Sequence, residues 1–132
     1  MLWVHDGTKT TLSQPGLTKR IVETLGLSSK FSTSCSTPAD KVALARDMGG
    51  DPATGIFNYK SVVGMLHHLN HARPDCAFAI HQCARYTFEP KKSHEVVIKR
   101  IGRYLKGTMS KGLILDPSDD LTIDFIWITV NC

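Results

Sequence analysis

Hydrophobic residues recur at helical spacing on both sides of one break in the chain, the tetrapeptide Ala-Arg-Pro-Asp at 72–75. Across 59–86, apolar residues repeat every three or four positions, so those on each side of the break share one face of a helix. Pro74 cannot continue the first helix, because it lacks an amide hydrogen and disfavours the helical conformation of the residue before it. It is well suited to begin the second helix, whose positive dipole end Asp75 would complement. We therefore predict a packed helical corner, which Arg73, Pro74 and Asp75 fix through capping and hydrogen bonds.

The same periodicity predicts a shorter helix over 17–25 and a long one over 93–106. Ser93 is the expected N-cap of the long helix, and Gly107 is expected to end it. Its apolar side consists of Val97, Ile98, Ile101, Tyr104 and Leu105.

Strands are predicted at both ends of the chain. An apolar start, the turn signal Asp6-Gly7 and the run 9–13 predict a hairpin. Near the C-terminus, 112–115 and 121–128 have the pattern of strands separated by a turn-rich linker. Residues 28–56 are rich in Ser, Pro and Gly and predict a long flexible loop. The predicted class is α+β, a helix-rich fragment with a short N-terminal β-hairpin and short C-terminal strands.

Positive charge is concentrated in one part of the chain. The formal net charge is +4, but residues 91–111 contain seven basic residues against Glu95 alone, a net of +6 that leaves −2 for the rest. Local basic character indicates a surface for an anionic partner. On the long predicted helix, one quarter of the circumference opposite the apolar side holds Lys92, Lys99, Arg103 and Lys106. For an isolated helix, an ordinary solvated face of snorkelling side chains is the favoured alternative.

Other candidate sites are weaker. His67 and His71 have an i, i+4 spacing that zinc sites use, but no further ligands accompany them, so an exposed polar face is favoured and no metal site is predicted. His81 is expected to be packed and hydrogen-bonded. Asp119-Asp120 has the setting of a solvated turn. No apolar run approaches the roughly 20 residues that cross a bilayer, so no membrane association is expected.

Several motifs occur in an order that resembles one known family. Around the helical corner these are Gly64-Met65-Leu66, Ala72-Arg73-Pro74-Asp75, Ala77-Phe78-Ala79 and His81-Gln82-Cys83-Ala84-Arg85-Tyr86. They are flanked by Leu12-Ser13-Gln14-Pro15-Gly16, Thr37-Pro38-Ala39, Lys99-Arg100-Ile101 and Arg103-Tyr104-Leu105-Lys106-Gly107-Thr108. Over roughly residues 1–124 the chain resembles the region that follows the polymerase palm in copia-type retrotransposon Pol polyproteins.

This resemblance implies a division of the chain and a role for each part. Residues 1–27 would be the end of a palm-like hairpin plus a helix, 28–56 a flexible loop, 57–108 thumb or connection-like helices, and 109–132 a truncated start of ribonuclease H-like strands. The parent activity would be RNA-directed DNA synthesis with magnesium. The catalytic carboxylates of that activity are absent from this chain, so we predict that it is inactive alone and contains no catalytic residue or cofactor site.

The expected partners are the backbone of an RNA–DNA hybrid or duplex and the remainder of the polyprotein, in an intracellular setting, cytoplasmic or nuclear. The backbone contacts are assigned to Lys92, Lys99, Arg103 and Lys106, with Lys91, Arg100 and Lys111 as additions. Two alternatives remain open at this point: a domesticated nucleic-acid-binding or protein-interaction module, and a pseudogene product without a function.

Overall fold

The computed structural model describes residues 2–28, 34–40 and 43–115. The elements follow in the order β1 (Leu2–Asp6), β2 (Lys9–Ser13), α1 (Pro15–Thr24), α2 (Tyr59–Leu69), the short 3-10 helix η1 (Pro74–Cys76), α3 (Ala77–Ala84), α4 (Lys92–Gly107) and β3 (Leu113–Leu115). The predicted α+β class, with a short N-terminal hairpin and helices on both sides of Pro74, is confirmed. The strand predicted over 121–128 and the pair Asp119-Asp120 lie outside the described residues.

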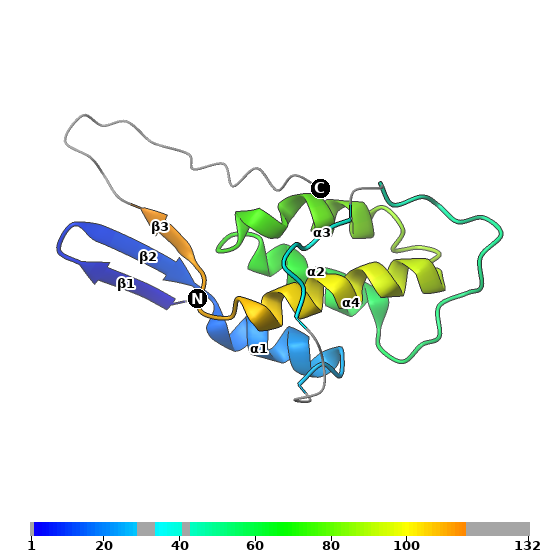
Figure 1. Ribbon diagram of the computed structural model, residues 1–132, viewed down its shortest axis with the longest axis horizontal. Coiled ribbons are helices and arrows are strands. Elements are labelled where there is room, and N and C mark those ends of the chain that lie inside the picture. Colours follow the sequence, from blue (N-terminus) through cyan, green and yellow to red (C-terminus); the bar gives the residue numbers. More distant parts are fainter. Residues whose placement is uncertain (1, 29–33, 41–42, 116–132) are drawn as a thin grey trace.

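The four α-helices pack around one apolar core, with the sheet at one end of the molecule (Figure 1). Helices α2 and α4 each pack against both α1 and α3. Gly102 of α4 faces α1 so closely that a Cβ there would lie 2.6 Å from Cδ1 of Leu25. Between α2 and α3, the buried Tyr59 hydroxyl donates to the Cys83 carbonyl at 2.7 Å. The fully buried hydrophobic side chains include Ile21, Val62, Leu66, Leu69, Ile80, Ile98, Ile101 and Leu105.

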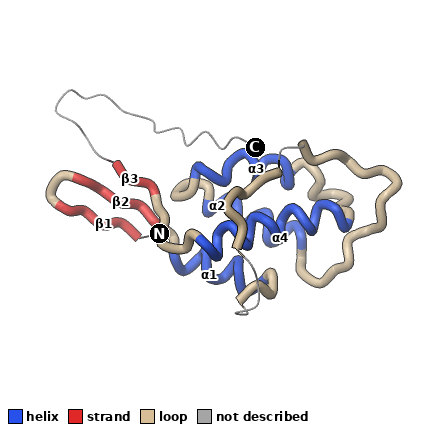
Figure 2. The backbone as a smooth tube through the Cα atoms, in the orientation of Figure 1, coloured by secondary structure: helices blue, strands red, loops and turns tan. Residues whose placement is uncertain are grey.

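The three strands form one antiparallel sheet in the order β1-β2-β3 (Figure 2). Gly7 has φ +62°, a left-handed conformation that favours glycine and that the predicted Asp-Gly turn requires. Leu12 of β2 is buried, whereas Leu2, Trp3 and Val4 of β1 are each about half exposed. The buried hydrophobic side chain of the sheet therefore lies on its central strand.

The long segment between α1 and α2 contains no helix or strand within its described parts, 34–40 and 43–58. In Figure 1 it crosses the helices and turns at the end of the molecule opposite the sheet. Backbone hydrogen bonds hold its later part against the start of α4: the Lys92 amide donates to the Asp51 carbonyl at 3.1 Å, and the Ala53 amide to the Pro90 carbonyl at 3.1 Å. This segment and α4 therefore form one surface.

Two predicted helix starts are wrong. Helix α1 begins at Pro15 rather than at residue 17, because proline is tolerated in the first turn, where its missing amide hydrogen has no intrahelical partner. Helix α4 begins at Lys92, so Ser93 is not its N-cap. The Ser93 hydroxyl instead donates to Oδ2 of Asp47 at 2.7 Å, and Nδ1 of His94 accepts from the Lys91 amide at 3.0 Å.

Candidate nucleic-acid interface

Helix α4 has one buried and one basic side. Its buried side includes Ile98, Ile101 and Leu105, none of which is exposed to solvent. The basic side consists of Lys92, Lys99, Arg103 and Lys106, and it is called the basic face below. At 1.5 Å per residue, the face extends about 21 Å from Lys92 to Lys106. The geometry thus gives four cations in one row, along a helix whose other side is fixed in the core.

The basic residues differ in their partners. Nζ of Lys92 lies 3.4 Å from Oδ2 of Asp51. Both side chains are more than half exposed, so solvent screens this ion pair strongly. Lys99 and Arg103 are half-buried and form no ion pair with a described residue. Lys106 is also half-buried, at the C-terminal end of the row.

Two of the three additional candidates are already engaged within the molecule. Arg100 lies 3.6 Å from Asp40 and donates to the Thr37 hydroxyl at 2.9 Å. Lys91 pairs with Glu89 at 3.1 Å. Lys111 is exposed beyond the end of α4. Arg100 and Lys91 would have to exchange these partners for a phosphate, whereas Lys99 and Arg103 would not.

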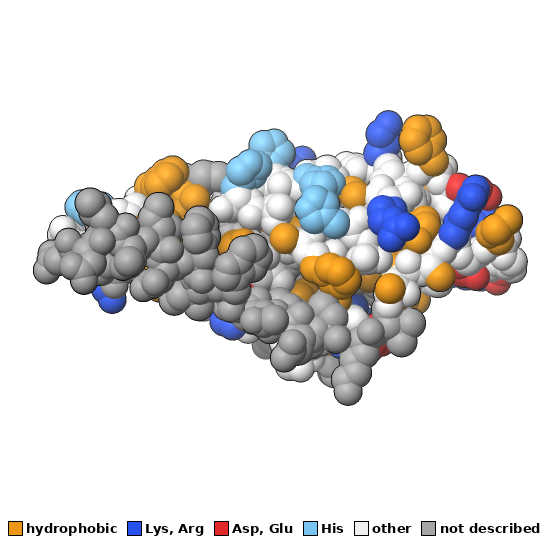
Figure 3. Space-filling view, turned by 90° about the horizontal axis from the view of Figure 1, so that it is seen from above, with side chains coloured by type: hydrophobic (Ala, Val, Ile, Leu, Met, Phe, Trp, Pro, Cys, Tyr) orange, Lys and Arg blue, Asp and Glu red, His pale blue; other side chains and the backbone are white. Residues whose placement is uncertain are grey.

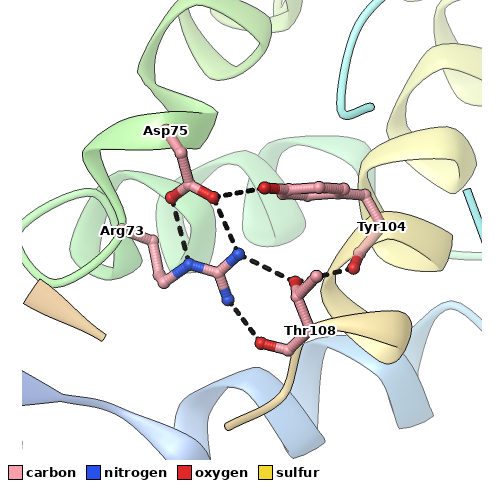
Figure 4. A network of polar contacts seen from close by, with 4 residues as sticks. All are labelled: Arg73, Asp75, Tyr104 and Thr108. Atoms are coloured by element: carbon pink, nitrogen blue, oxygen red, sulfur yellow. Dashed lines mark hydrogen bonds and ion pairs between the residues drawn. The ribbon is translucent and has the colours of Figure 1, made fainter. Parts of the chain in front are cut away.

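A buried polar network joins the helical corner to the C-terminal end of α4 (Figure 4). The Arg73 guanidinium, 2% exposed, donates to both carboxylate oxygens of Asp75, at 3.0 and 2.9 Å. It also donates to the carbonyl and the hydroxyl of Thr108, at 2.9 and 2.8 Å. The Tyr104 hydroxyl completes the group by donating to Asp75 at 2.6 Å. Two of the quoted motifs, 72–75 and 103–108, therefore meet at a structural junction and not at an open site.

Electrostatics in this network favour the ionised carboxylate. Burial by itself would raise the pKa of Asp75, but the hydrogen bonds from Arg73 and Tyr104 and the Arg73 charge outweigh it and lower that pKa below its usual range. Burial and the hydrogen bond to Asp75 raise the pKa of Tyr104 to about 12. The network is thus an internal ion pair with a neutral phenol beside it, and it orients the last turn of the helix that bears the basic face.

Beside the basic face, α3, α4 and the long segment before α2 line a hollow of about 160 Å³. Arg103 belongs both to its lining and to the basic face, and Arg100 lies next to it. Phe78, 47% exposed, and Val96, 61% exposed, also line it. The remaining wall is mostly apolar and includes Ala39, Leu44, Ala79 and Val97. The sequence analysis missed this hollow, because its walls come from three separate segments of the chain.

Figure 3 shows several histidine side chains close together on one face of the molecule, with hydrophobic and basic side chains nearby. His67, His68 and His71 are exposed. His81 is exposed as well, and its ring meets the edge of His67 with centroids 5.9 Å apart, so the prediction of a packed histidine is wrong. Within 2–28, 34–40 and 43–115, no three His, Cys, Asp or Glu side chains are placed to hold a metal ion. The described residues therefore do not fit a magnesium site.

Two further polar residues were missed because their partners are distant in sequence. Glu95 is 4% exposed and accepts hydrogen bonds from the amide and the hydroxyl of Thr54, at 3.1 and 2.9 Å. The His94 ring is fully buried and stacks on Tyr86, with centroids 4.3 Å apart. Its Nε2 donates to the Ala45 carbonyl at 2.8 Å, because a carbonyl can only accept.

Among the helices that the structure describes, none has the length and apolar content to cross a membrane.

Comparison with known proteins gives three relatives from Arabidopsis thaliana. The chain is 30% identical over 97 residues, 74% of its length, to the retrovirus-related Pol polyprotein from transposon RE1. It is 34% identical over 65 residues, 49% of its length, to the corresponding protein from transposon RE2. An uncharacterized mitochondrial protein, AtMg00810, is 32% identical over 66 residues, 50% of this chain and 28% of that protein.

The matches cover only 6% and 4% of the RE1 and RE2 polyproteins, so the chain spans a small part of these relatives. No protein-family model matches the chain. No solved structure matches it significantly either. The sequence is thus similar to a short segment of retrotransposon Pol polyproteins.

Proposed function

We propose that the chain corresponds to the C-terminal part of the reverse transcriptase in a copia-type retrotransposon Pol polyprotein, and that the basic face of α4 contacts the backbone of an RNA–DNA hybrid or duplex. The relationship to the RE1 and RE2 polyproteins supports the first part. The observation on which the second part depends is the row Lys92, Lys99, Arg103 and Lys106, opposite the buried side of α4. RNA-directed DNA synthesis is the activity that we propose for the parent polyprotein.

The geometry suits phosphates better than base edges. The basic face is about 21 Å long, which corresponds to about six base-pair steps of a duplex at about 3.4 Å each. Long cationic side chains in such a row neutralise successive phosphates and distinguish sequences poorly. Binding should therefore be independent of sequence and strongly dependent on salt, since each neutralised phosphate adds about −0.9 to the slope of log affinity against log salt.

The role in this proposal is to hold nucleic acid, and no chemical step is assigned to the described residues. Lys99 and Arg103 are the central contacts, because they have no ion pair within the described residues that a phosphate would have to replace. Lys92 would exchange a screened, exposed pair with Asp51 for a phosphate. The buried Arg73 network at the other end keeps the last turn of α4 in place.

The test is fluorescence anisotropy with a labelled RNA–DNA hybrid across a series of salt concentrations. The double variant Lys99→Gln, Arg103→Gln should weaken binding and flatten the salt slope by about 1.8, the value for two phosphates. The matched control is Lys19→Gln, Arg20→Gln, which removes the same charge from exposed positions on α1. The proposal is overturned if wild-type affinity is insensitive to salt, or if both double variants lose affinity equally.

A further inference from the structure

The hollow beside the basic face has the size of one aromatic ring. Its volume of about 160 Å³ is similar to that of apolar protein cavities of about 150 Å³ that take up a benzene molecule. Phe78 from α3 and Val96 from α4 line it and remain partly exposed. An exposed phenylalanine at the edge of an apolar hollow is the arrangement on which unstacked nucleobases pack in single-strand binding proteins.

The hollow is also next to cations. Val96 lies between Lys92 and Lys99 along α4, and Arg103 lines the hollow while belonging to the basic face. A strand whose phosphates follow the basic face would therefore bring its bases past the hollow. The lining itself contains Arg100 and Arg103 against Asp40, a formal net charge of +1. This net positive charge and the adjacent basic face favour a nucleotide over an uncharged apolar ligand.

Two polar atoms on the hollow's residues lack partners. Oε1 of Gln82 and Nε of Arg100 are buried without a hydrogen bond to any described residue. Unpaired buried polar atoms are rare and costly, so two of them around one hollow require an explanation. Both are covered, and a ligand reaches them only after the side chain rotates. Gln82 loses no hydrogen bond with a described residue by rotating, whereas Arg100 exchanges its ion pair with Asp40 and its hydrogen bond to the Thr37 hydroxyl for the contact with the ligand.

We propose that this hollow binds an unpaired pyrimidine base of the thymine or uracil type, from a single strand whose phosphates contact the basic face. Such a base has one ring, which fits the volume. Its ring N–H can donate to the Gln82 carbonyl oxygen, and a neighbouring ring carbonyl can accept from Nε of Arg100. Phe78 packs against the ring. The inference rests on the proposed function for the phosphate contacts and adds a site for a base.

The experiment compares two labelled single strands of equal length and charge, an oligo(dT) and the same backbone with abasic sites in place of the bases. Fluorescence anisotropy should give an affinity for oligo(dT) about fivefold or more above that for the abasic strand, because one stacked base contributes that much or more. Phe78→Ala should abolish the difference and leave binding to the abasic strand unchanged. Phe88→Ala is the matched control, since Phe88 is fully exposed and does not line the hollow.

Equal wild-type affinity for the two strands would overturn the inference without any variant, so it can be tested even if Phe78→Ala fails to fold. A preference for oligo(dT) that survives Phe78→Ala would overturn it too. Sedimentation velocity on the same samples tests another occupant: a dimer that Phe78→Ala abolishes would mean that the hollow is covered by a second copy. Failure of the proposed function appears separately, as salt-insensitive binding of the RNA–DNA hybrid.

Discussion

The Arg73 guanidinium donates hydrogen bonds to both the carbonyl and the hydroxyl oxygen of Thr108, 35 residues further along the chain, at 2.9 and 2.8 Å. This contact attaches the helical corner to the C-terminal end of α4. Because Arg73 also holds Asp75 in a two-point ion pair, removal of the arginine leaves a buried carboxylate with Tyr104 as its remaining side-chain partner. The junction is therefore sensitive to single substitutions even though it is not a catalytic site.

We expect Arg73→Met to lower the free energy of unfolding by about 3–5 kcal/mol, because breaking a buried pair leaves an uncompensated charge. Urea denaturation followed by far-ultraviolet circular dichroism measures the loss. The control is Lys60→Met, an exposed position of α2, where a change within about 0.5 kcal/mol is expected. In the Arg73→Met background, Asp75→Asn should lower the free energy of unfolding by less than it does in the wild type, since the pair is already broken. Additive losses would contradict the assigned pairing.

The stability of the junction should also depend on pH. The folded-state pKa of Asp75 is lowered, so the carboxylate stabilises the fold above the unfolded-state pKa of about 3.9, and this contribution is lost as the pH falls below that value toward the folded-state pKa. Tyr104→Phe removes one of the hydrogen bonds that lower the pKa. We therefore expect its free energy of unfolding to start falling at the same pH as that of the wild type, but to fall by less and to level off at a higher pH, because its folded-state pKa lies closer to the unfolded-state value. Urea titrations between pH 7 and pH 2.5 test this, and a curve parallel to the wild type would contradict it.

The helices could be predicted because their stability depends on a local pattern. Apolar residues at three- and four-residue steps place Leu66, Ile80 and Ile98 on buried faces whatever the rest of the chain does. Pro74 fixes the position of the corner through its own backbone chemistry. The basic face was likewise visible in the sequence, because charges at helical spacing fall on one side of a helix.

Contacts between distant segments could not be predicted in this way. Nothing local to Thr54 indicates that it binds Glu95, 41 residues later, and a glutamate in the first turn of a helix normally indicates exposure. The hollow depends on how α3 meets α4, and the helical pattern leaves that arrangement open. Arg100 is predicted as an additional phosphate contact, yet in the structure it is paired with Asp40 from a segment without periodicity.

The cysteines should differ in their rates of alkylation because they differ in burial. Burial raises the pKa of the Cys76 and Cys83 thiols to about 12, and thiolate is the reactive form, so both should resist alkylation at pH 8. Of the three cysteines within the described residues, Cys35 is half-buried and should react first. Peptide mapping by mass spectrometry after timed treatment with iodoacetamide follows each site separately. The same reaction in urea should label all three at similar rates. Fast native labelling of Cys83 would show that α2 and α3 open more readily than their packing indicates.

The last prediction concerns the attachment of the long segment to α4. Glu95 is buried and is the partner of both the Thr54 amide and the Thr54 hydroxyl, so Glu95→Ala leaves two donors without their acceptor. A hydrogen bond to a charged group contributes about 1.5–3 kcal/mol, enough to release the residues around Thr54 while the helical core remains folded. We expect faster tryptic cleavage after the exposed Arg46, with a nearly unchanged helical circular dichroism signal.

The matched control is Glu23→Ala, which removes an exposed carboxylate from α1 and none of the hydrogen bonds that hold the long segment. Because an exposed position of this kind contributes little to stability, the rate of cleavage after Arg46 should be unchanged in this variant. Equal cleavage of the two variants would mean that Glu95 does not hold the segment in place. Loss of the helical signal in Glu95→Ala alone would mean instead that the segment is an integral part of the core, since its release would then unfold α4 as well.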